Sequence, residues 1–266
     1  MCYDFRMSLP ELVTPLKRQT LSGDVYAQLR ELLISGHMMP GEQISLRSTA
    51  AALGVSVMPV REAVHRLVAE QALELTPNRA LRVPIMSVSQ FGEITSIRVN
   101  LEGLATEQAA EHLSDAAIVQ ITALHDRFAE EMARSRPDSS KLISVNKELH
   151  FAVYKGAGMP ILLQMIEALW LRIGPILNHD LRSGSRRVGE QVAVDHHARL
   201  VAALKRRDGV AARAALQGDI ESAAEYIVSA GVLLAADAFD EPVPDAGKPA
   251  AKTARRAAAS GGRKTV

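Results

Sequence analysis

The feature of this sequence that most constrains the fold is a close succession of helix caps and helix breaks over residues 45–59. Ser45 is placed to cap a short helix, and Gly54 interrupts that helix. Ser56 can cap another helix, with Pro59 in its first turn, where the missing N–H of proline costs nothing. The segment therefore predicts two helices joined by a tight turn.

Helical and strand-like patterns flank this turn. An apolar helical pattern covers about 22–35, and the helix that begins at Ser56 ends near Gln71. Two short apolar segments, 72–75 and 81–85, then predict a small hairpin. Helix, helix, tight turn, helix and hairpin within about seventy residues are typical of a winged helix-turn-helix, whose helix after the turn enters the DNA major groove.

From Ser87 onward the hydrophobic periodicity is helical throughout, in about six segments. Ser114, Pro137 and the pair 208–209 mark breaks between segments. Aromatic residues make up only 4% of the chain, which favours helices over strands. The sequence predicts a mainly α fold, with an N-terminal winged helix-turn-helix followed by an antiparallel all-α helical bundle.

Four parts follow from these patterns. We expect a flexible lead over 1–16, a winged helix-turn-helix domain over 17–86, an all-helical domain over 87–236 and a disordered, basic Ala/Pro-rich tail over 237–266.

Cysteine content and hydropathy bound the compartment. Cys2 is the single cysteine, so no internal disulfide can form and a reducing compartment is natural. No apolar h-region opens the chain, and no later apolar run approaches ~18 residues. The sequence predicts a cytoplasmic protein without membrane insertion. The formal net charge of +1 neither supports nor excludes a nucleic-acid partner.

The residues around the tight turn resemble those of a known family. The motif comprises Pro40-Gly41, Leu53-Gly54-Val55-Ser56, Pro59-Val60-Arg61-Glu62-Ala63, Leu67 and Leu73. It resembles the GntR family of bacterial transcriptional regulators. The length and placement of the remainder resemble the FadR-type branch, whose C-terminal (FCD) domain is a helical bundle that binds an effector. The resemblance covers about 25–228.

This resemblance implies that Arg47 and Arg61 contact DNA. Arginine can donate two hydrogen bonds to guanine or phosphate, and the N-terminal end of a recognition helix points into the groove. The alternative is that both arginines are solvated surface charges, or that Arg61 pairs with Glu62 or Glu42.

Further candidate DNA contacts lie at the start of the recognition helix, one turn beyond Arg61 and in the wing. They are Ser56, Val57, Met58, His65, Arg79 and Arg82. Val57 stands where the family often carries another arginine, so apolar side chains there could contact a thymine methyl instead. Ala80 stands where the wing commonly has a glycine. Surface charge without DNA contact is the alternative for His65 and the wing arginines.

A candidate metal site follows from helix geometry together with the resemblance. Asn146 and His150 share a helix face at i and i+4. FadR-type domains commonly carry Asp or Asn followed by His at this spacing, and two more histidines on the last two helices. In this sequence the position of the first of these two histidines falls at His197, and that of the second falls at Asp219. A hairpin turning at 208–209 would place the latter two at equal distances from the turn, so they can face one another.

Two imidazoles, a carboxylate and an amide oxygen would suit a divalent metal such as Zn, Ni or Mn. The alternative is that His150 and His197 are core histidines, hydrogen-bonded to Asn146 and Asp219. Arg98 and Arg172 are candidates for binding an acidic effector through two hydrogen bonds. An Arg98–Glu102 pair and an ordinary buried salt bridge of Arg172 are the alternatives.

The leading hypothesis is a homodimeric regulator, and not an enzyme. It would act as a repressor, with activation as the alternative, and would bind a two-fold double-stranded DNA operator and respond to a small organic acid. One alternative is a helical-bundle metalloenzyme, although no general base or nucleophile accompanies the cluster. Another is a nucleoid-type protein that binds DNA nonspecifically through basic residues of its tail. These residues are Lys248, Lys252, Arg255, Arg256, Arg263 and Lys264.

Overall fold

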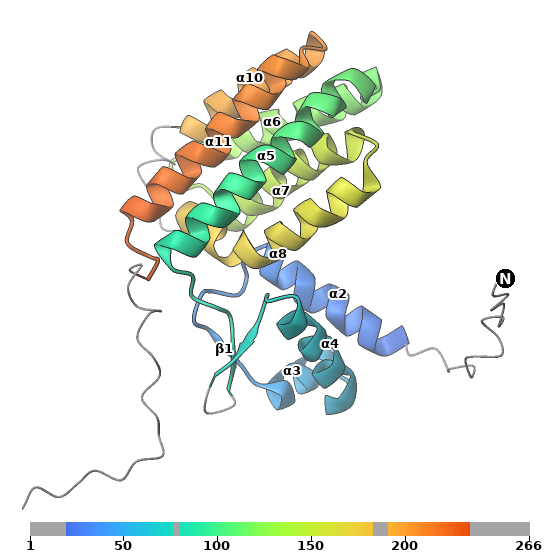
Figure 1. Ribbon diagram of the computed structural model, residues 1–266, viewed down its shortest axis with the longest axis vertical. Coiled ribbons are helices and arrows are strands. Elements are labelled where there is room, and N and C mark those ends of the chain that lie inside the picture. Colours follow the sequence, from blue (N-terminus) through green and yellow to red (C-terminus); the bar gives the residue numbers. More distant parts are fainter. Residues whose placement is uncertain (1–19, 77–79, 183–190, 235–266) are drawn as a thin grey trace, which may run out of the picture.

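The computed structural model describes residues 20–76, 80–182 and 191–234. Within these ranges the protein has nine helices and one small sheet, arranged in two units (Figure 1). The predicted mainly α fold, with a winged helix-turn-helix before a helical bundle, is confirmed. The predicted lead over 1–16 and tail over 237–266 lie outside the described residues.

The N-terminal unit, here called the winged unit, contains three helices and three short strands. Its elements are α2 (Thr20–Ile34), β1 (Gln43–Ile44), α3 (Leu46–Leu53), α4 (Val57–Ala69), β2 (Glu74–Leu75) and β3 (Leu81–Arg82). The strands form an antiparallel sheet in the order β1-β3-β2, so the predicted hairpin is confirmed as β2–β3. Strand β1 was not predicted, because a two-residue strand is too short to show alternation.

The turn between α3 and α4 forms as the sequence predicts. The Ser45 side chain accepts a hydrogen bond from the Ser48 N–H, and Gly54 ends α3 in the left-handed conformation with φ +66°. Glycine adopts this φ without steric cost, which permits the abrupt change of direction. Ser56 occupies the N-cap position of α4, but its side chain makes no capping hydrogen bond.

Packing between α2 and α4 forms the core of the winged unit. Val25, Leu29 and Leu33 follow one line of i, i+4 positions along α2 and are buried. Leu32 belongs to the same apolar pattern over residues 22–35, but 38% of it is exposed. It lies about 100° round the helix from Leu33, and this rotation carries it towards solvent.

The C-terminal unit, here called the bundle, contains the six predicted helical segments. They are α5 (Val88–His112), α6 (Asp115–Met132), α7 (Ser139–Gly156), α8 (Pro160–Arg182), α10 (Val192–Lys205) and α11 (Gly209–Ser229). The predicted cap at Ser114 is confirmed, since its side chain accepts from the Ala117 N–H. Helix α5 packs against α11, α7 and α8, and therefore lies at the centre of the bundle (Figure 1).

The last two helices form the predicted hairpin. Arg207, with φ +58°, is the left-handed residue of its turn, and Asp208 caps α11 by accepting from the Ala211 N–H. Gly209 serves a different purpose, because a Cβ there would lie 2.9 Å from the Glu107 carbonyl oxygen of α5. The turn can thus rest directly on α5.

Apolar periodicity along α5 predicts one buried face with Phe91, Ile94, Ile97 and Leu104, and the structure agrees for Phe91 and Ile94 alone of these four. Ile97 and Leu104 are 39% and 36% exposed, whereas Arg98 and Glu102 are buried. These two charged side chains pair with each other inside the bundle, at 2.6 Å between Arg98 Nε and Glu102 Oε1. Apolar periodicity alone predicts the wrong exposure for Ile97 and Leu104, because in the sequence a buried ion pair cannot be told from charged residues on a solvated face.

Helix α8 contains an 18-residue window, Pro160–Leu177, that is long and apolar enough to cross a membrane by length and composition. The expectation that no apolar run approaches this length was wrong. In the structure, 44% of the window is buried, and α8 packs against α2, α5 and α7. Its apolar face therefore serves as a packing surface between the two units.

The winged unit contacts the bundle where α2 meets α8 (Figure 1). Arg30 of α2 pairs with Glu167 of α8 at 2.9 Å, and Lys147 of α7 pairs with Glu31. A Cβ at Gly174 would lie 2.8 Å from the carbonyl oxygen of Ile34. The end of α2 therefore approaches α8 too closely to admit a larger residue.

Gly174→Ala is expected to destabilise this junction by about 1–3 kcal/mol, because the added methyl would overlap rigid backbone atoms of α2. Thermal unfolding of the whole protein would measure the loss. Gly92→Ala is the matched control, since a Cβ there meets nothing within 4 Å and should stabilise α5 by about 0.5–1 kcal/mol. Equal effects of the two substitutions would contradict the proposed close contact.

Candidate functional site

One face of α4 is exposed to solvent. Val60, Val64 and Leu67 are buried against the rest of the winged unit, whereas Arg61 and His65 are exposed. Both sets follow the helical repeat, so the polar residues occupy the side opposite the core. In Figure 1, α3 and α4 lie at the end of the molecule away from the bundle.

The two arginines expected to contact DNA are both exposed. Arg47 lies in the first turn of α3, and Arg61 lies in the first turns of α4. Across the described part of the chain, neither guanidinium forms a hydrogen bond or an ion pair. Pairing of Arg61 with Glu62 or Glu42, the alternative considered above, is therefore not seen. Both cations remain available to an external anion.

The remaining DNA candidates differ in position. Ser56 and Met58 are exposed, Met58 by 56%, whereas Val57 is half-buried and packs against the core. Arg82 forms an ion pair with Glu74 on the neighbouring strand, a partner that only the strand register reveals. Arg79 lies outside the described residues.

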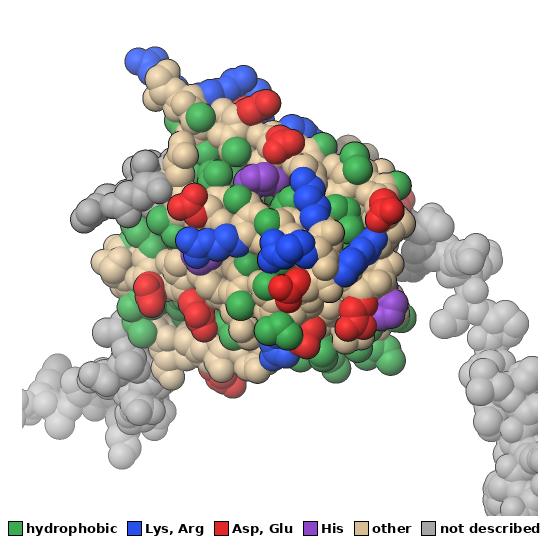
Figure 2. Space-filling model, turned by 90° about the horizontal axis from the view of Figure 1, so that it is seen from above, with side chains coloured by type: hydrophobic (Ala, Val, Ile, Leu, Met, Phe, Trp, Pro, Cys, Tyr) green, Lys and Arg blue, Asp and Glu red, His purple; other side chains and the backbone are tan. Residues whose placement is uncertain are grey.

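The opposite end of the protein has a mixed surface. Seen from above, the end of the bundle carries Lys and Arg side chains interspersed with Asp and Glu and with apolar residues (Figure 2). Interspersed charges of both signs suit solubility more than phosphate binding. The exposed face of α3 and α4, which carries Arg47 and Arg61, is the candidate nucleic-acid surface.

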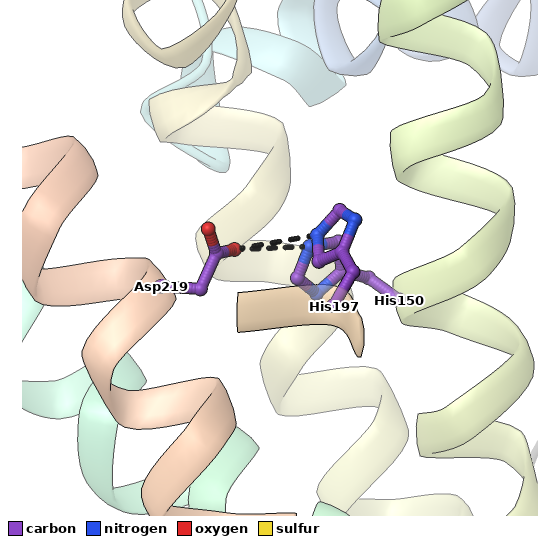
Figure 3. Close-up of side chains that lie close together, drawn as sticks. All are labelled: His150, His197 and Asp219. Atoms are coloured by element: carbon purple, nitrogen blue, oxygen red, sulfur yellow. Dashed lines mark ion pairs between the residues drawn. The ribbon is translucent and has the colours of Figure 1, made fainter. Parts of the chain in front are cut away.

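Three of the four predicted metal ligands meet inside the bundle. His150 of α7, His197 of α10 and Asp219 of α11 point toward one another (Figure 3). The Nε2 atoms of the two histidines lie 3.4 Å and 3.6 Å from Asp219 Oδ2. All three side chains are buried, with 2%, 0% and 7% of their surface exposed. One candidate ligand atom from each residue lies within 4.8 Å of the others.

The fourth predicted ligand lines the same cavity. Asn146, His150, Asp219 and Arg98 border a space of about 40 Å³, closed on another side by Trp170. His196, the neighbour of His197, is not part of the cluster and lies against α11, where a Cβ at Gly218 would be 2.7 Å from its ring. The sequence pattern therefore selected the inward histidine of this neighbouring pair.

The cluster fits a divalent cation. His197 is fully buried, and neither of its ring nitrogens has a hydrogen-bond partner within the described structure. An unsatisfied buried imidazole is costly, and metal coordination would satisfy it. Separations of 3.4 Å and 3.6 Å also match neighbouring ligands of an ion with bonds of about 2.0–2.2 Å.

Burial lowers the pKa of His197, despite the opposing effect of Asp219. The ring therefore stays neutral, the form that binds a metal. His125 lies beside it with 6.5 Å between ring centroids, and burial lowers its pKa as well. No ligand spacing in the sequence points to His125, which lies on α6.

A chain of buried polar side chains continues from the cluster into α5. His150 Nδ1 lies 3.0 Å from the Tyr154 hydroxyl, and this hydroxyl donates to Glu102. Burial, followed by the charge of Glu102, raises the pKa of Tyr154 well above its usual value of 10.0. Tyr154 was missed in the sequence, although it follows His150 by one helical turn on the same face.

The two arginines proposed to bind an effector are in different environments. Arg98 lines the cavity but is held by Glu102 through two hydrogen bonds, which is the alternative that the sequence analysis considered. Arg172 of α8 is not among the residues that line the cavity. Its Nε is buried without a hydrogen-bond partner in the described ranges. Of the two, only Arg98 is placed next to the metal candidates.

Comparisons with known proteins agree on both units. Residues 21–83 match the family model described as bacterial regulatory proteins, gntR family, and residues 93–222 match the FCD domain. The chain is 34% identical to the HTH-type transcriptional regulator McbR of Escherichia coli over 193 residues, covering 73% of this chain and 86% of the relative. It is 26% identical over 151 residues to the E. coli repressor GlaR, covering 55% and 68% of the two chains.

Solved structures show the same architecture. E. coli McbR/YncC superposes with a TM-score of 0.72 at 30% identity, covering 80% of this chain and all of the other. A GntR regulator from Rhodococcus sp. RHA1 has a TM-score of 0.67 at 20% identity, covering 80% and 99%, which shows the shared fold.

Proposed function

Because the chain belongs to the GntR family of bacterial transcriptional regulators and carries an FCD domain, we propose that it binds a two-fold operator as a homodimer under the control of a small carboxylate. The carboxylate would bind next to a divalent metal held by His150, His197, Asp219 and Asn146. Transcriptional regulation and an effector-binding domain are properties of the family, and the residues that perform them in this chain are our proposal.

The observation that carries the proposal is the exposed outer face of α4, with Arg61 unpaired among the described residues. A buried recognition helix could not enter a DNA groove, and a guanidinium already bound to a carboxylate would lose much of its value for guanine or phosphate. One winged unit reads few bases, so a homodimer on a two-fold site is the arrangement that reaches useful specificity.

The charges of the cavity support an anionic effector. Asp219 and Glu102 contribute two negative charges, and Arg98 contributes one positive charge. With neutral imidazoles, a divalent cation would leave the cluster with a net charge of +1. When bound, the metal would supply a Lewis-acidic centre for a carboxylate oxygen.

The size of the cavity suggests how such an effector could act. A space of about 40 Å³ holds an ion with about one or two water molecules, and is too small for a larger organic acid. Binding such an acid therefore requires the surrounding helices to move. An effector that binds the opened arrangement more tightly would shift the population of arrangements, which is the requirement for a switch.

The finer assignments are also part of this proposal. GlaR and RspR of E. coli are named as transcriptional repressors, and we propose repression here as well. We propose that the protein acts in the cytoplasm, where its operator lies. We also propose that the His/His/Asp cluster binds a ligand and does not catalyse a reaction.

The test is a titration of the full chain against DNA flanking its own gene, followed by fluorescence anisotropy. We expect tighter binding to one two-fold sequence than to a scrambled duplex, and release by one organic acid from a panel. Treatment with a chelator should weaken the response to that acid. If the protein shows no sequence selectivity under any condition, the proposal that the exposed face of α4 reads an operator is refuted.

A further inference from the structure

We infer that Tyr154, held by Glu102 and Arg98, is a positioning residue that fixes the tautomer and ring orientation of His150, so that His150 Nε2 is presented to the cation site. The inference rests on the proposed metal function of the cluster. It assigns a role to Tyr154, Glu102 and Arg98, which are not themselves proposed as metal ligands.

The positions of these side chains are set by three helices. Tyr154 follows His150 by one turn of α7, so both project from the same face of that helix. Glu102 reaches the Tyr154 hydroxyl from α5, and Arg98, one turn earlier on α5, holds Glu102 at 2.6 Å and 3.3 Å. Trp170 of α8 covers the Arg98 guanidinium, 5.3 Å from its ring centroid.

Burial restricts this network of hydrogen-bonded side chains to one arrangement. Glu102 is 0% exposed, Tyr154 is 1% exposed and Arg98 is 3% exposed. Water cannot readily replace any of the hydrogen bonds, and breaking one would leave a buried polar group unsatisfied. The network therefore acts as a rigid support for the ring of His150.

The direction of each hydrogen bond then fixes the protonation of His150. A phenol has a single proton, and Tyr154 donates it to the Glu102 carboxylate, which also accepts from Arg98. The Tyr154 oxygen can only accept from His150 Nδ1, 3.0 Å away. A neutral His150 must consequently carry its proton on Nδ1 and a lone pair on Nε2.

That lone pair faces another acceptor. His150 Nε2 lies 3.4 Å from the Asp219 Oδ2 atom, so two acceptors point into one space. Such an arrangement favours a cation between them, and it prepares His150 as a ligand before the metal arrives. Buried hydrogen-bond partners of this kind commonly change metal affinity by about 10–100-fold.

His197 provides an internal contrast. Both of its ring nitrogens lack hydrogen-bond partners in the part of the chain that the structure describes. Its tautomer is not fixed by a neighbour in the way that of His150 is. The two histidine ligands should therefore respond differently to removal of the Tyr154 hydroxyl.

Tyr154→Phe in the full chain tests the inference, with Zn²⁺ alone as the probe. Competition against a chromophoric chelator should show an affinity for Zn²⁺ about 10–100-fold weaker than that of the parent. Tyr26→Phe is the matched control, because the Tyr26 hydroxyl also donates to a glutamate, Glu70, at 2.7 Å in the winged unit. That control should bind Zn²⁺ like the parent, and equal affinities of the two variants would overturn the inference.

A second measurement needs no substitution. In the metal-free parent above neutral pH, ¹⁵N-edited NMR of the histidine side chains should show His150 with its proton on Nδ1, and His197 without this fixed preference. A proton on Nε2 of His150 would overturn the inference even if Tyr154→Phe failed to fold. A parent that binds no Zn²⁺ would instead refute the metal proposal, while the NMR result would still decide the tautomer.

Discussion

Arg61→Ala is expected to abolish sequence-selective DNA binding while leaving a weaker, salt-sensitive affinity for any duplex. The Arg61 side chain is exposed near the N-terminal end of α4, the part of a recognition helix that contacts base edges. A bidentate arginine contact with guanine is worth about 1–3 kcal/mol of discrimination, and a homodimer would lose it twice. The ratio of affinities for operator and scrambled DNA, measured by anisotropy at fixed salt, reports this loss.

Arg66→Ala is the matched control on the same helix. The Arg66 guanidinium lies 3.6 Å from the centroid of the Tyr26 ring and 3.0 Å from Glu70, so it braces α4 against α2. Its removal should lower stability more than sequence selectivity. If Arg61→Ala kept the selectivity of the control, Arg61 would not read bases, and its role would be limited to phosphate contact.

His197→Ala should weaken Zn²⁺ binding by more than about 100-fold, beyond the effect usual for a supporting residue. The imidazole is fully buried, and its Nε2 lies 3.6 Å from the carboxylate that both histidines share. Isothermal titration calorimetry would measure the affinity. The parent should gain about 2.7 kcal/mol of stability at a metal concentration of 100 times Kd, and the variant should not.

His196→Ala provides the neighbouring control. The His196 ring rests over Gly218 and is not part of the cluster, so Zn²⁺ binding should persist in this variant. Equal loss in both variants would show that the effect comes from disturbing α10 and not from removing a ligand. Retention in both would exclude His197 as a ligand.

Local sequence signals accounted for the elements and for much of the candidate site. Caps at Ser45 and Ser114 and the break at Gly54 predicted where helices begin and end, because these signals act within one or two turns of the chain. The i, i+4 relation of Asn146 and His150 is also local. The family resemblance gave the positions His197 and Asp219, and their equal distance from a short hairpin turn supported the expectation that they face one another.

Other features depended on contacts between distant segments. The exposure of Ile97 and Leu104 reflects the rotation of α5 in the bundle, and this rotation is set by the helices around it. The Arg82–Glu74 pair requires the register of two strands. Neither rotation nor register is fixed by the periodicity of a single segment.

Local sequence patterns were enough to predict the order of the helices, the hairpin β2–β3 and the tight turn before α4, and with the family resemblance they gave the candidate ligands on α7, α10 and α11. The contacts that link His150 to Tyr154, Tyr154 to Glu102 and Glu102 to Arg98 became visible only in the folded protein. Caps and apolar periodicity act within a few residues, so the sequence is enough to predict them. A buried charge is stable only when packing brings its partners within hydrogen-bond distance, and these partners can come from other helices.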